Sequence, residues 1–371
     1  MKAPSGLGLA YKKAVSCALC FAPDQSISTL LHSPPLCLPL CGFAVSRPTF
    51  VVGGTVFVSS WGWGAMGPWR RPCVGALLAC AAIAASCCCF QLQGADAAAS
   101  PSFGDNFEIT GAEDHVKTSP DGQTWYLSLD NKTGVGFQTK QKYLFGWFSM
   151  KLKLVGNDSA GVVTAYYMCS DLDAAPERDE LDFEFLGNRT GEPYIIQTNV
   201  YRSGVGGREM RHSLWFDPTA DFHSYSILWN PKQIVFFVDK VAIREYRNSA
   251  KPNKFFPIMK PMYVFSSIWN ADDWATRGGL EKTDWTKGPF VSSYSDFTAD
   301  ACAWPSGPAP PACAAATGDS WWDQPPAWAL EDGQRRDSGW VARNLVIYDY
   351  CGDRKRFPTV PEECALRTTT S

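Results

Sequence analysis

Residues 178–187 read RDELDFEFLG, and this stretch decides the fold. With a period of two, Glu180, Asp182 and Glu184 share one face, and three large apolar side chains alternate with them on the other. The alternation predicts a strand that packs its apolar face on a core and turns the three carboxylates to solvent. Three acids at alternate positions repel one another, so folding gains nothing obvious from them.

Neighbouring carboxyl groups do have a chemical use. Their pKa values can separate, which leaves one carboxyl protonated near neutral pH and another ionised. Cleavage of a glycosidic bond with retention needs such a pair roughly 5–5.5 Å apart. Glu180 and Glu184 lie about 13 Å apart along a flat strand, and side chains that lean inward close much of that gap. Taken alone, the pattern fits equally well a half-buried strand with a solvated acidic face.

The surrounding segments decide between these interpretations. DELDFEFLGNRT is followed by QTNVY at 197–201 and WNADDWATRGGLEKTDW at 269–285, and preceded by LSLDNKTGVGFQTK and YLFGWFSMKLKLV. In this order the motifs resemble the xyloglucan endotransglucosylase/hydrolases of glycoside hydrolase family 16, from about Phe103 to about Cys364. The chain departs from the family's usual His at Arg178 and its usual Ile at Leu181. Arg178 places a permanent cation near the acids, where it favours an ionised carboxylate.

The resemblance assigns roles to the three acids. It implies that Glu180 is the nucleophile, Glu184 the general acid and then base, and Asp182 the residue that orients and polarises Glu180. It also implies a substrate-binding set: Gln197, Asn199, Trp269, Trp274, Gly278, Tyr348 and Arg356. Of these, the first two belong to the glycone side, the two tryptophans stack on sugars, and the last two belong to the acceptor side.

Each of these residues also has a plainer interpretation. Gln197 and Asn199 suit an ordinary polar strand face, and a Trp lies more often in a core than against a ligand, although Trp274 is the better candidate for exposure. The C-terminal segment with Tyr348 and Arg356 would then only clamp the edge of the sandwich.

Short strands separated by turn signals extend over much of the chain. The clearest are 125–129, 147–154, 162–168, 180–186, 194–201, 223–228, 234–238, 263–269 and 345–350. Many strands with almost no helical periodicity predict an all-β, two-sheet antiparallel sandwich. The resemblance implies a β-jelly roll with a concave substrate cleft over residues 98–298, and a small extension stapled by disulfides over 299–371.

The first hundred residues differ from the rest. Met66 begins a basic segment, an apolar run and a small-residue tail, which together predict a secretory signal peptide at 66–97. Residues 1–65 are then an over-extended gene model or a disordered segment. The alternative is a signal anchor with a cytoplasmic tail at 1–70, although the apolar run is short for a bilayer. We expect a secreted protein of the cell wall and apoplast, without stable membrane association after cleavage.

Nine of the 14 Cys precede residue 90 and would be lost on processing, which leaves five in the mature chain. Disulfides among the remaining Cys would agree with secretion. The resemblance implies the disulfides Cys302–Cys313 and Cys351–Cys364, and Cys169 is expected to be a buried small hydrophobe rather than a reactive thiol. Three N-glycosylation sequons begin at 131, 157 and 188, and Asn188 matches the family's glycan position.

Charge and composition exclude several classes of protein. The 371 residues carry a net charge of -3, which gives no nucleic-acid footprint. The Cys and His spacings suit no metal site, and we expect no metal, no cofactor and a monomer. The resemblance implies a secreted plant enzyme that cuts xyloglucan and rejoins it to another xyloglucan chain. Net hydrolysis with water as acceptor, and a catalytically silent wall-binding lectin, are the alternatives.

Overall fold

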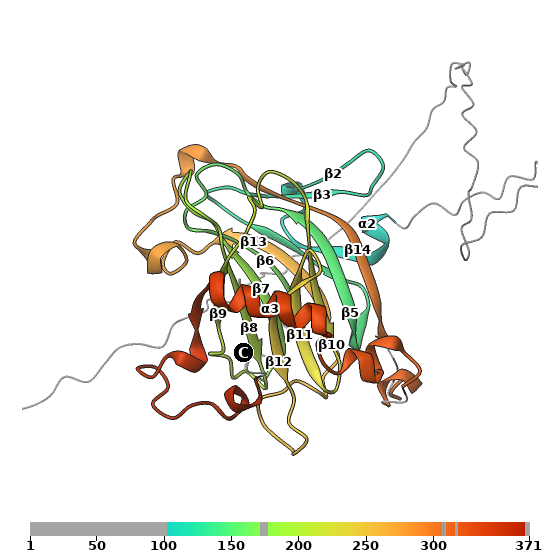
Figure 1. Ribbon diagram of the computed structural model, residues 1–371. Coiled ribbons are helices and arrows are strands. Elements are labelled where there is room, and N and C mark those ends of the chain that lie inside the picture. Colours follow the sequence, from blue (N-terminus) through green and yellow to red (C-terminus); the bar gives the residue numbers. More distant parts are fainter. Residues whose placement is uncertain (1–101, 171–176, 306, 308, 316–317, 368–371) are drawn as a thin grey trace, which may run out of the picture. The chain divides into compact units, whose positions relative to one another are not determined.

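The computed structural model describes residues 102–170, 177–305, 307, 309–315 and 318–367. Within this part the chain forms two antiparallel sheets (Figure 1). The eight-stranded sheet has the order β1 (Phe107–Gly111), β4 (Val135–Thr139), β13 (Tyr263–Asn270), β6 (Val162–Cys169), β7 (Glu180–Leu186), β8 (Ile195–Tyr201), β9 (Met210–Ser213), β15 (Val346–Asp349). The seven-stranded sheet has the order β12 (Val241–Arg247), β11 (Gln233–Val238), β10 (His223–Trp229), β5 (Lys142–Lys153), β14 (Phe290–Trp304), β3 (Trp125–Leu129), β2 (Val116–Thr118). The predicted all-β, two-sheet antiparallel sandwich is confirmed.

The apolar face of β7 lies in the core between the two sheets. Phe183 and Phe185 are both fully buried. Phe183 meets Phe236 of β11 with ring centroids 5.1 Å apart, and Phe185 meets Tyr225 of β10 at 4.7 Å, both edge to face. Such aromatic pairs contribute about 0.5–1.5 kcal/mol each beyond the burial of their area. The alternation in the sequence therefore fixes which side of β7 faces the other sheet.

The opposite face of β7 corrects one expectation. Glu180, Asp182 and Glu184 were expected to face solvent, but they are only 5%, 2% and 4% exposed. The reason is the position of β7, which has four strands on one side of it in the sheet and three on the other. Gln197 of β8 contacts Glu184 and Arg178, which precedes β7, contacts Glu180, so these acids are buried rather than on an open surface.

The C-terminal segment connects the two sheets. Strand β14 (Phe290–Trp304) crosses residue 298, the expected end of the catalytic domain, and pairs with β5. Cys302 therefore lies within the seven-stranded sheet. The chain then passes over the outer side of β5, where the rings of Trp147 and Trp321 lie 6.2 Å apart. It returns as helix α3 (Asp332–Asn344) and β15, which pairs with β9 at the edge of the eight-stranded sheet. The extension therefore covers that edge and brings new side chains to it.

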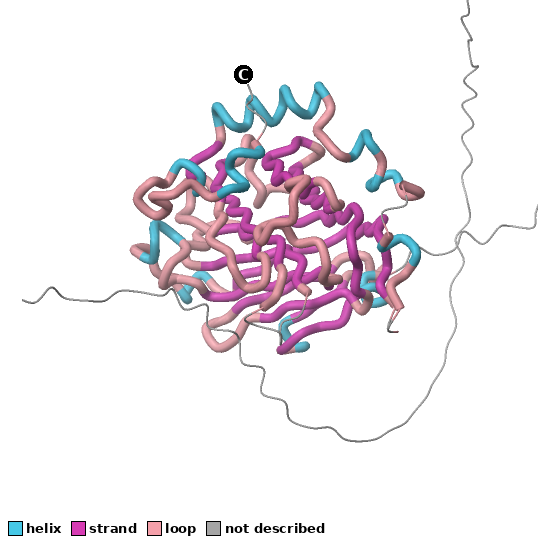
Figure 2. Tube along the Cα trace, turned by 90° about the horizontal axis from the view of Figure 1, so that it is seen from below, coloured by secondary structure: helices cyan, strands magenta, loops and turns pink. Residues whose placement is uncertain are grey.

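Local sequence explains where α3 begins and which side it buries. Glu331 and Gln334 form a capping box, in which the Glu331 backbone N–H donates to Gln334 Oε1 at 3.0 Å. Val341 is fully buried against the sandwich. Figure 2 shows the helical segments, α3 and the short α2 (Phe103–Asn106) among them, around the strands rather than between them.

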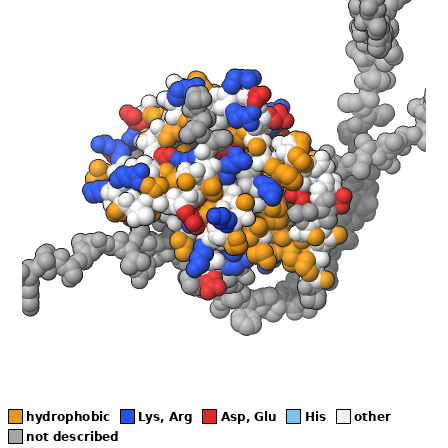
Figure 3. All heavy atoms as spheres, turned by 60° about the horizontal axis from the view of Figure 1, so that its bottom comes forward, with side chains coloured by type: hydrophobic (Ala, Val, Ile, Leu, Met, Phe, Trp, Pro, Cys, Tyr) orange, Lys and Arg blue, Asp and Glu red, His pale blue; other side chains and the backbone are white. Residues whose placement is uncertain are grey.

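None of the helices in the described ranges is long and apolar enough to cross a bilayer. On the face drawn in Figure 3, Lys and Arg side chains are scattered beside an area of apolar side chains. The predicted signal peptide at 66–97 and the segment 1–65 lie outside the described residues.

Candidate active site

Strand register places the predicted site residues in rows across the eight-stranded sheet. In one row, Glu184 lies opposite Ala165 of β6 and Gln197 of β8. Gln197 lies opposite Arg211 of β9, which in turn lies opposite Tyr348 of β15. A single row therefore joins the predicted general acid to a predicted acceptor-side residue far along the chain.

Hydrogen bonds follow this row. Gln197 Nε2 donates to Glu184 Oε2 at 2.6 Å, and Arg211 Nε donates to Gln197 Oε1 at 2.8 Å. The Arg211 guanidinium also lies over the ring of Tyr348, 5.8 Å from its centroid. Arg211 is a site residue that the sequence analysis missed, because only the pairing of β8 with β9 brings it to Gln197.

Asp182 lies in the next row, between Tyr167 of β6 and Asn199 of β8. Tyr167 stacks on Phe265 of β13 with ring centroids 5.1 Å apart, which forms an apolar wall on one side of the acids. Asn199 Oδ1 accepts from two backbone N–H groups at 2.9 and 3.0 Å. With its oxygen engaged, the Asn199 amide can only donate toward a substrate.

Glu180 begins β7 and lies opposite Cys169 of β6 and Tyr201 of β8. Its Oε2 accepts a hydrogen bond from Nε of Arg178, with which it forms an ion pair. The two predicted catalytic glutamates therefore have different partners, a cation for Glu180 and a neutral amide for Glu184.

The two predicted stacking tryptophans lie at the other end of β7. Trp269 and Trp274 are both half-buried and pack on a small apolar cluster that includes Leu186. Thr276 holds their loop in place, since its Oγ1 donates to the Gly187 carbonyl and accepts from the Gly161 N–H, each at 2.8 Å. The tryptophans therefore have one side on the protein and one side partly open.

Gly278 lies in the same loop as Trp274 and is exposed. Its φ of +69° lies in the left-handed region, where glycine is favoured, and a Cβ there would meet nothing within 4 Å. Gly278 therefore allows the backbone of the loop to adopt this conformation, and the space beside it is open.

Tyr348 and Arg356 lie together at the β9–β15 edge. Arg356 Nη1 donates to Glu209 Oε2 at 2.7 Å and to the Tyr348 hydroxyl at 3.5 Å, and that hydroxyl donates to Asp353 Oδ2 at 2.9 Å. The backbone N–H of Arg356 and the hydroxyl of Tyr348 lower the pKa of Asp353. Tyr348 therefore connects this charged group to Arg211.

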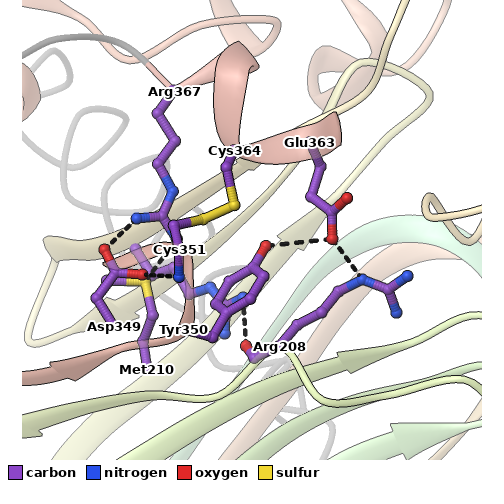
Figure 4. Close-up of a disulfide and its surroundings, with 9 residues drawn as sticks. Arg208, Met210, Asp349, Tyr350, Cys351, Glu363, Cys364 and Arg367 are labelled. Atoms are coloured by element: carbon purple, nitrogen blue, oxygen red, sulfur yellow. Dashed lines mark hydrogen bonds and ion pairs between the residues drawn. A yellow bond between two sulfur atoms is a disulfide. The ribbon is translucent and has the colours of Figure 1, made fainter. Parts of the chain in front are cut away.

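The structure contains the two disulfides that the resemblance implies. Cys302–Cys313 has its Cα atoms 5.6 Å apart, and Cys351–Cys364 has them 5.8 Å apart, whereas Cys169 is buried and belongs to neither. Figure 4 shows the Cys351–Cys364 disulfide with Glu363 and Arg208 nearby. Arg208 Nε donates to Glu363 Oε1 at 2.7 Å.

Asn188 follows β7 directly and is half-buried. Its Nδ2 donates to the Pro193 carbonyl at 2.9 Å, and its Oδ1 accepts from the Arg189 N–H at 3.0 Å. Asn131 and Asn157, which begin the other two sequons, are exposed.

Comparison with known proteins places this arrangement in a family. The Glycosyl hydrolases family 16 profile matches residues 103–287, and the Xyloglucan endo-transglycosylase (XET) C-terminus profile matches residues 316–364. The fold and the carboxylate strand thus define a glycosyl hydrolase of family 16. Within that class, the chain belongs to the xyloglucan endotransglucosylase/hydrolase family.

Two curated relatives illustrate the match. The probable xyloglucan endotransglucosylase/hydrolase protein 8 of Arabidopsis thaliana is 68% identical over 268 residues, which cover 71% of this chain and 87% of that protein. A probable xyloglucan endotransglucosylase/hydrolase protein of Nicotiana tabacum is 54% identical over 262 residues, which cover 71% and 88%.

Proposed function

We propose that the protein cleaves the β-1,4-glucan backbone of xyloglucan with retention and transfers the new end to another xyloglucan chain. One observation carries the assignment of roles: Glu180 contacts a cation, whereas Glu184 accepts from a neutral amide. A cation favours the ionised carboxylate that a nucleophile needs. Glu184, which accepts from a neutral amide, is the better candidate for the proton donor.

In the first step, the Glu180 carboxylate attacks the anomeric carbon of the donor chain. The glycosidic bond breaks, and the Glu184 carboxylic acid gives its proton to the departing oxygen. The donor is then held as an ester on Glu180, and Glu184 is ionised. Asp182, one residue pair away from each glutamate on the same face of β7, orients and polarises Glu180.

In the second step, an acceptor hydroxyl attacks the anomeric carbon and gives its proton to Glu184. The ester bond breaks and Glu180 returns to the carboxylate form. Water is in vast excess, so transfer wins only if an acceptor chain is bound and oriented beside the ester. The row from Glu184 through Arg211 to Tyr348 supports an acceptor site at the β9–β15 edge.

The experiment follows the size of xyloglucan with time, with and without added xyloglucan oligosaccharides. Transfer predicts slow loss of chain length with polymer alone and fast loss when acceptor is added. Equal rates, with one new reducing end for each cut, would indicate a hydrolase, and binding without any change in polymer size would indicate a lectin.

We further propose that the chain is secreted to the cell wall as a monomer. The signal peptide would occupy residues 66–97, the catalytic jelly roll 98–298 and the extension 299–371, with a glycan on Asn188. N-terminal sequencing and glycopeptide mapping of the endogenous protein test these points. Any peptide from residues 1–60 would contradict a start at Met66.

A further inference from the structure

We infer that Arg178 is a positioning residue for the transfer reaction, which holds Glu180 as a carboxylate and promotes its release from the glycosyl-enzyme. The inference rests on the proposed role of Glu180 as nucleophile. It adds to that role a permanent positive charge, supplied by a residue that precedes β7.

The contact is direct and partly buried. Arg178 Nε donates to Glu180 Oε2, and the two side chains are 22% and 7% exposed. The guanidinium carbon lies 6.0 Å from the ring centroid of Tyr201, which faces Glu180 across the β7–β8 ladder. The cation is therefore held between the carboxylate and an aromatic face, where water screens the charge less than it does at the surface.

The backbone beside Arg178 is anchored, so the guanidinium does not owe its position to Glu180 alone. The next residue, Asp179, is fully buried, and its carboxylate accepts from Arg202 Nη1 at 2.6 Å and from the Ser203 N–H at 2.7 Å. The Arg178 carbonyl accepts from the Gly204 N–H at 2.7 Å. These bonds tie the start of β7 to the loop that follows β8.

Several other groups of the described strands lie around Glu180, and a further cation, Lys142, has its Nζ over the Tyr263 ring, 4.8 Å from the centroid. Cys169 of β6 and Tyr201 of β8 lie opposite it, Tyr263 of β13 lies beyond Cys169, and Asp182 is the next acid on its own strand. Burial is the largest influence and acts against the charged form of Arg178, but the interactions with Glu180, Cys169 and Asp182 together outweigh it, and the pKa of Arg178 is raised.

This charge affects the two chemical steps differently. When Glu180 forms the ester, its negative charge disappears and a half-buried guanidinium loses its counterion. When the acceptor oxygen attacks, the bond between the anomeric carbon and Glu180 breaks, the electron pair returns to the carboxylate, and the ion pair forms again. The cation therefore stabilises the free carboxylate relative to the ester, and keeps the glycosyl-enzyme short-lived.

The test compares three variants by pH profile and by trapping. Arg178→Gln removes the cation that favours the Glu180 carboxylate. We expect the acid limb of the kcat/KM profile to move to higher pH by about one unit or more. It should also raise the fraction of glycosyl-enzyme found by intact mass after acid quench. Arg178→Lys should keep both near the parent values. Arg178→His should behave like the parent below about pH 6 and like the Gln variant above about pH 7, since an unperturbed imidazole titrates near 6.5.

Lys151→Gln is the matched control. It also removes one cation, from an ion pair with Asp296 at 2.6 Å on the seven-stranded sheet, and should leave the acid limb and the trapped fraction unchanged. Melting curves check that each variant is folded. If Arg178→Gln does not fold, the contrast between the His and Lys variants across pH 6–7 carries the test.

The outcomes separate this inference from the proposed function. An Arg178→Gln profile that matches the parent, with no extra glycosyl-enzyme, overturns the inference, provided that Glu180→Ala abolishes turnover. Turnover that persists in Glu180→Ala would instead overturn the proposed function. A His variant without any pH-dependent difference from the Lys variant would also overturn the inference.

Discussion

Gln197 donates its Nε2 to Glu184 Oε2 over 2.6 Å, and the orientation of this amide is set by Arg211. Because a guanidinium only donates, the Arg211 Nε at 2.8 Å requires the amide oxygen on its own side. A flipped amide would turn its oxygen toward the Glu184 carboxylate. Arg211 therefore connects to Glu184 through Gln197 and lies one strand further along the sheet.

Arg211→Met should lower kcat by about ten- to hundredfold, because a hydrogen bond to a charged group contributes about 1.5–3 kcal/mol. The KM for the donor should change little. Steady-state kinetics measure both values, with Arg335→Met as the control, since Arg335 pairs with Asp332 on the surface of α3. A parent-like kcat in Arg211→Met would show that the amide keeps its orientation without the guanidinium.

Glu180→Ala should abolish turnover, because no covalent glycosyl-enzyme can form. Glu184→Ala should lose activity on xyloglucan but retain reaction with donors whose leaving group needs no protonation. Initial rates on the polymer and on an activated aryl glycoside distinguish the two variants. Near-normal rates of Glu180→Ala on xyloglucan would contradict the assignment of Glu180 as the nucleophile.

Asp182→Asn should reduce kcat while KM stays near the parent value, because the proposed role of Asp182 is to tune the nucleophile rather than to bind sugar. The substitution keeps the size of the side chain at a position that is 2% exposed. Kinetics are combined with binding of a xyloglucan oligosaccharide by calorimetry. A loss of binding equal to the loss of kcat/KM would assign Asp182 to substrate binding instead.

The Cys351–Cys364 disulfide should contribute more to acceptor use than Cys302–Cys313, because it directly follows β15, which carries Tyr348. Removing either bond by paired Ser substitutions should lower stability by about 2–4 kcal/mol, given loops of 13 and 11 residues. Only loss of Cys351–Cys364 should also raise the KM for acceptor oligosaccharides. Equal acceptor KM values in the two variants would count against a role for this edge in acceptor binding.

His212 should make stability fall in mild acid. Burial, followed by the nearby Arg244 charge, lowers the pKa of His212 to about 4. Between this value and the usual 6.5 the unfolded chain binds the extra proton, so stability is complete above about pH 6.5 and falls as pH approaches 4, by about 3 kcal/mol. Denaturant unfolding at several pH values should show this fall, and His212→Phe should flatten it. His115→Gln, which leaves His212 in place, should keep it.

Strands with large alternating side chains were predictable from sequence. The predicted ranges 125–129 and 180–186 have the bounds of β3 and β7, since bulky apolar residues alternate there between clear turn signals. By contrast, β14 was not predicted, because its many small and polar side chains carry little pattern. Pairing with β5 and β3 makes it a strand.

The site was predictable in its residue types but not in its connections. Alternation assigns Glu180, Asp182 and Glu184 to one face, but it does not say which neighbours cover that face, so their burial was missed. The contribution of Arg211 depends on how β8 pairs with β9 and β9 with β15. Register between strands far apart in the chain leaves no mark in either strand's own sequence.

The pairing of β15 with β9 has a consequence for biosynthesis. Strand β9 is complete long before β15 leaves the ribosome, so a nascent chain presents an open strand edge on the sheet that carries the acids. Open strand edges invite pairing with other chains. A chain that ends after β9 but before residue 346 would therefore keep this edge open and be prone to associate edge to edge with its neighbours.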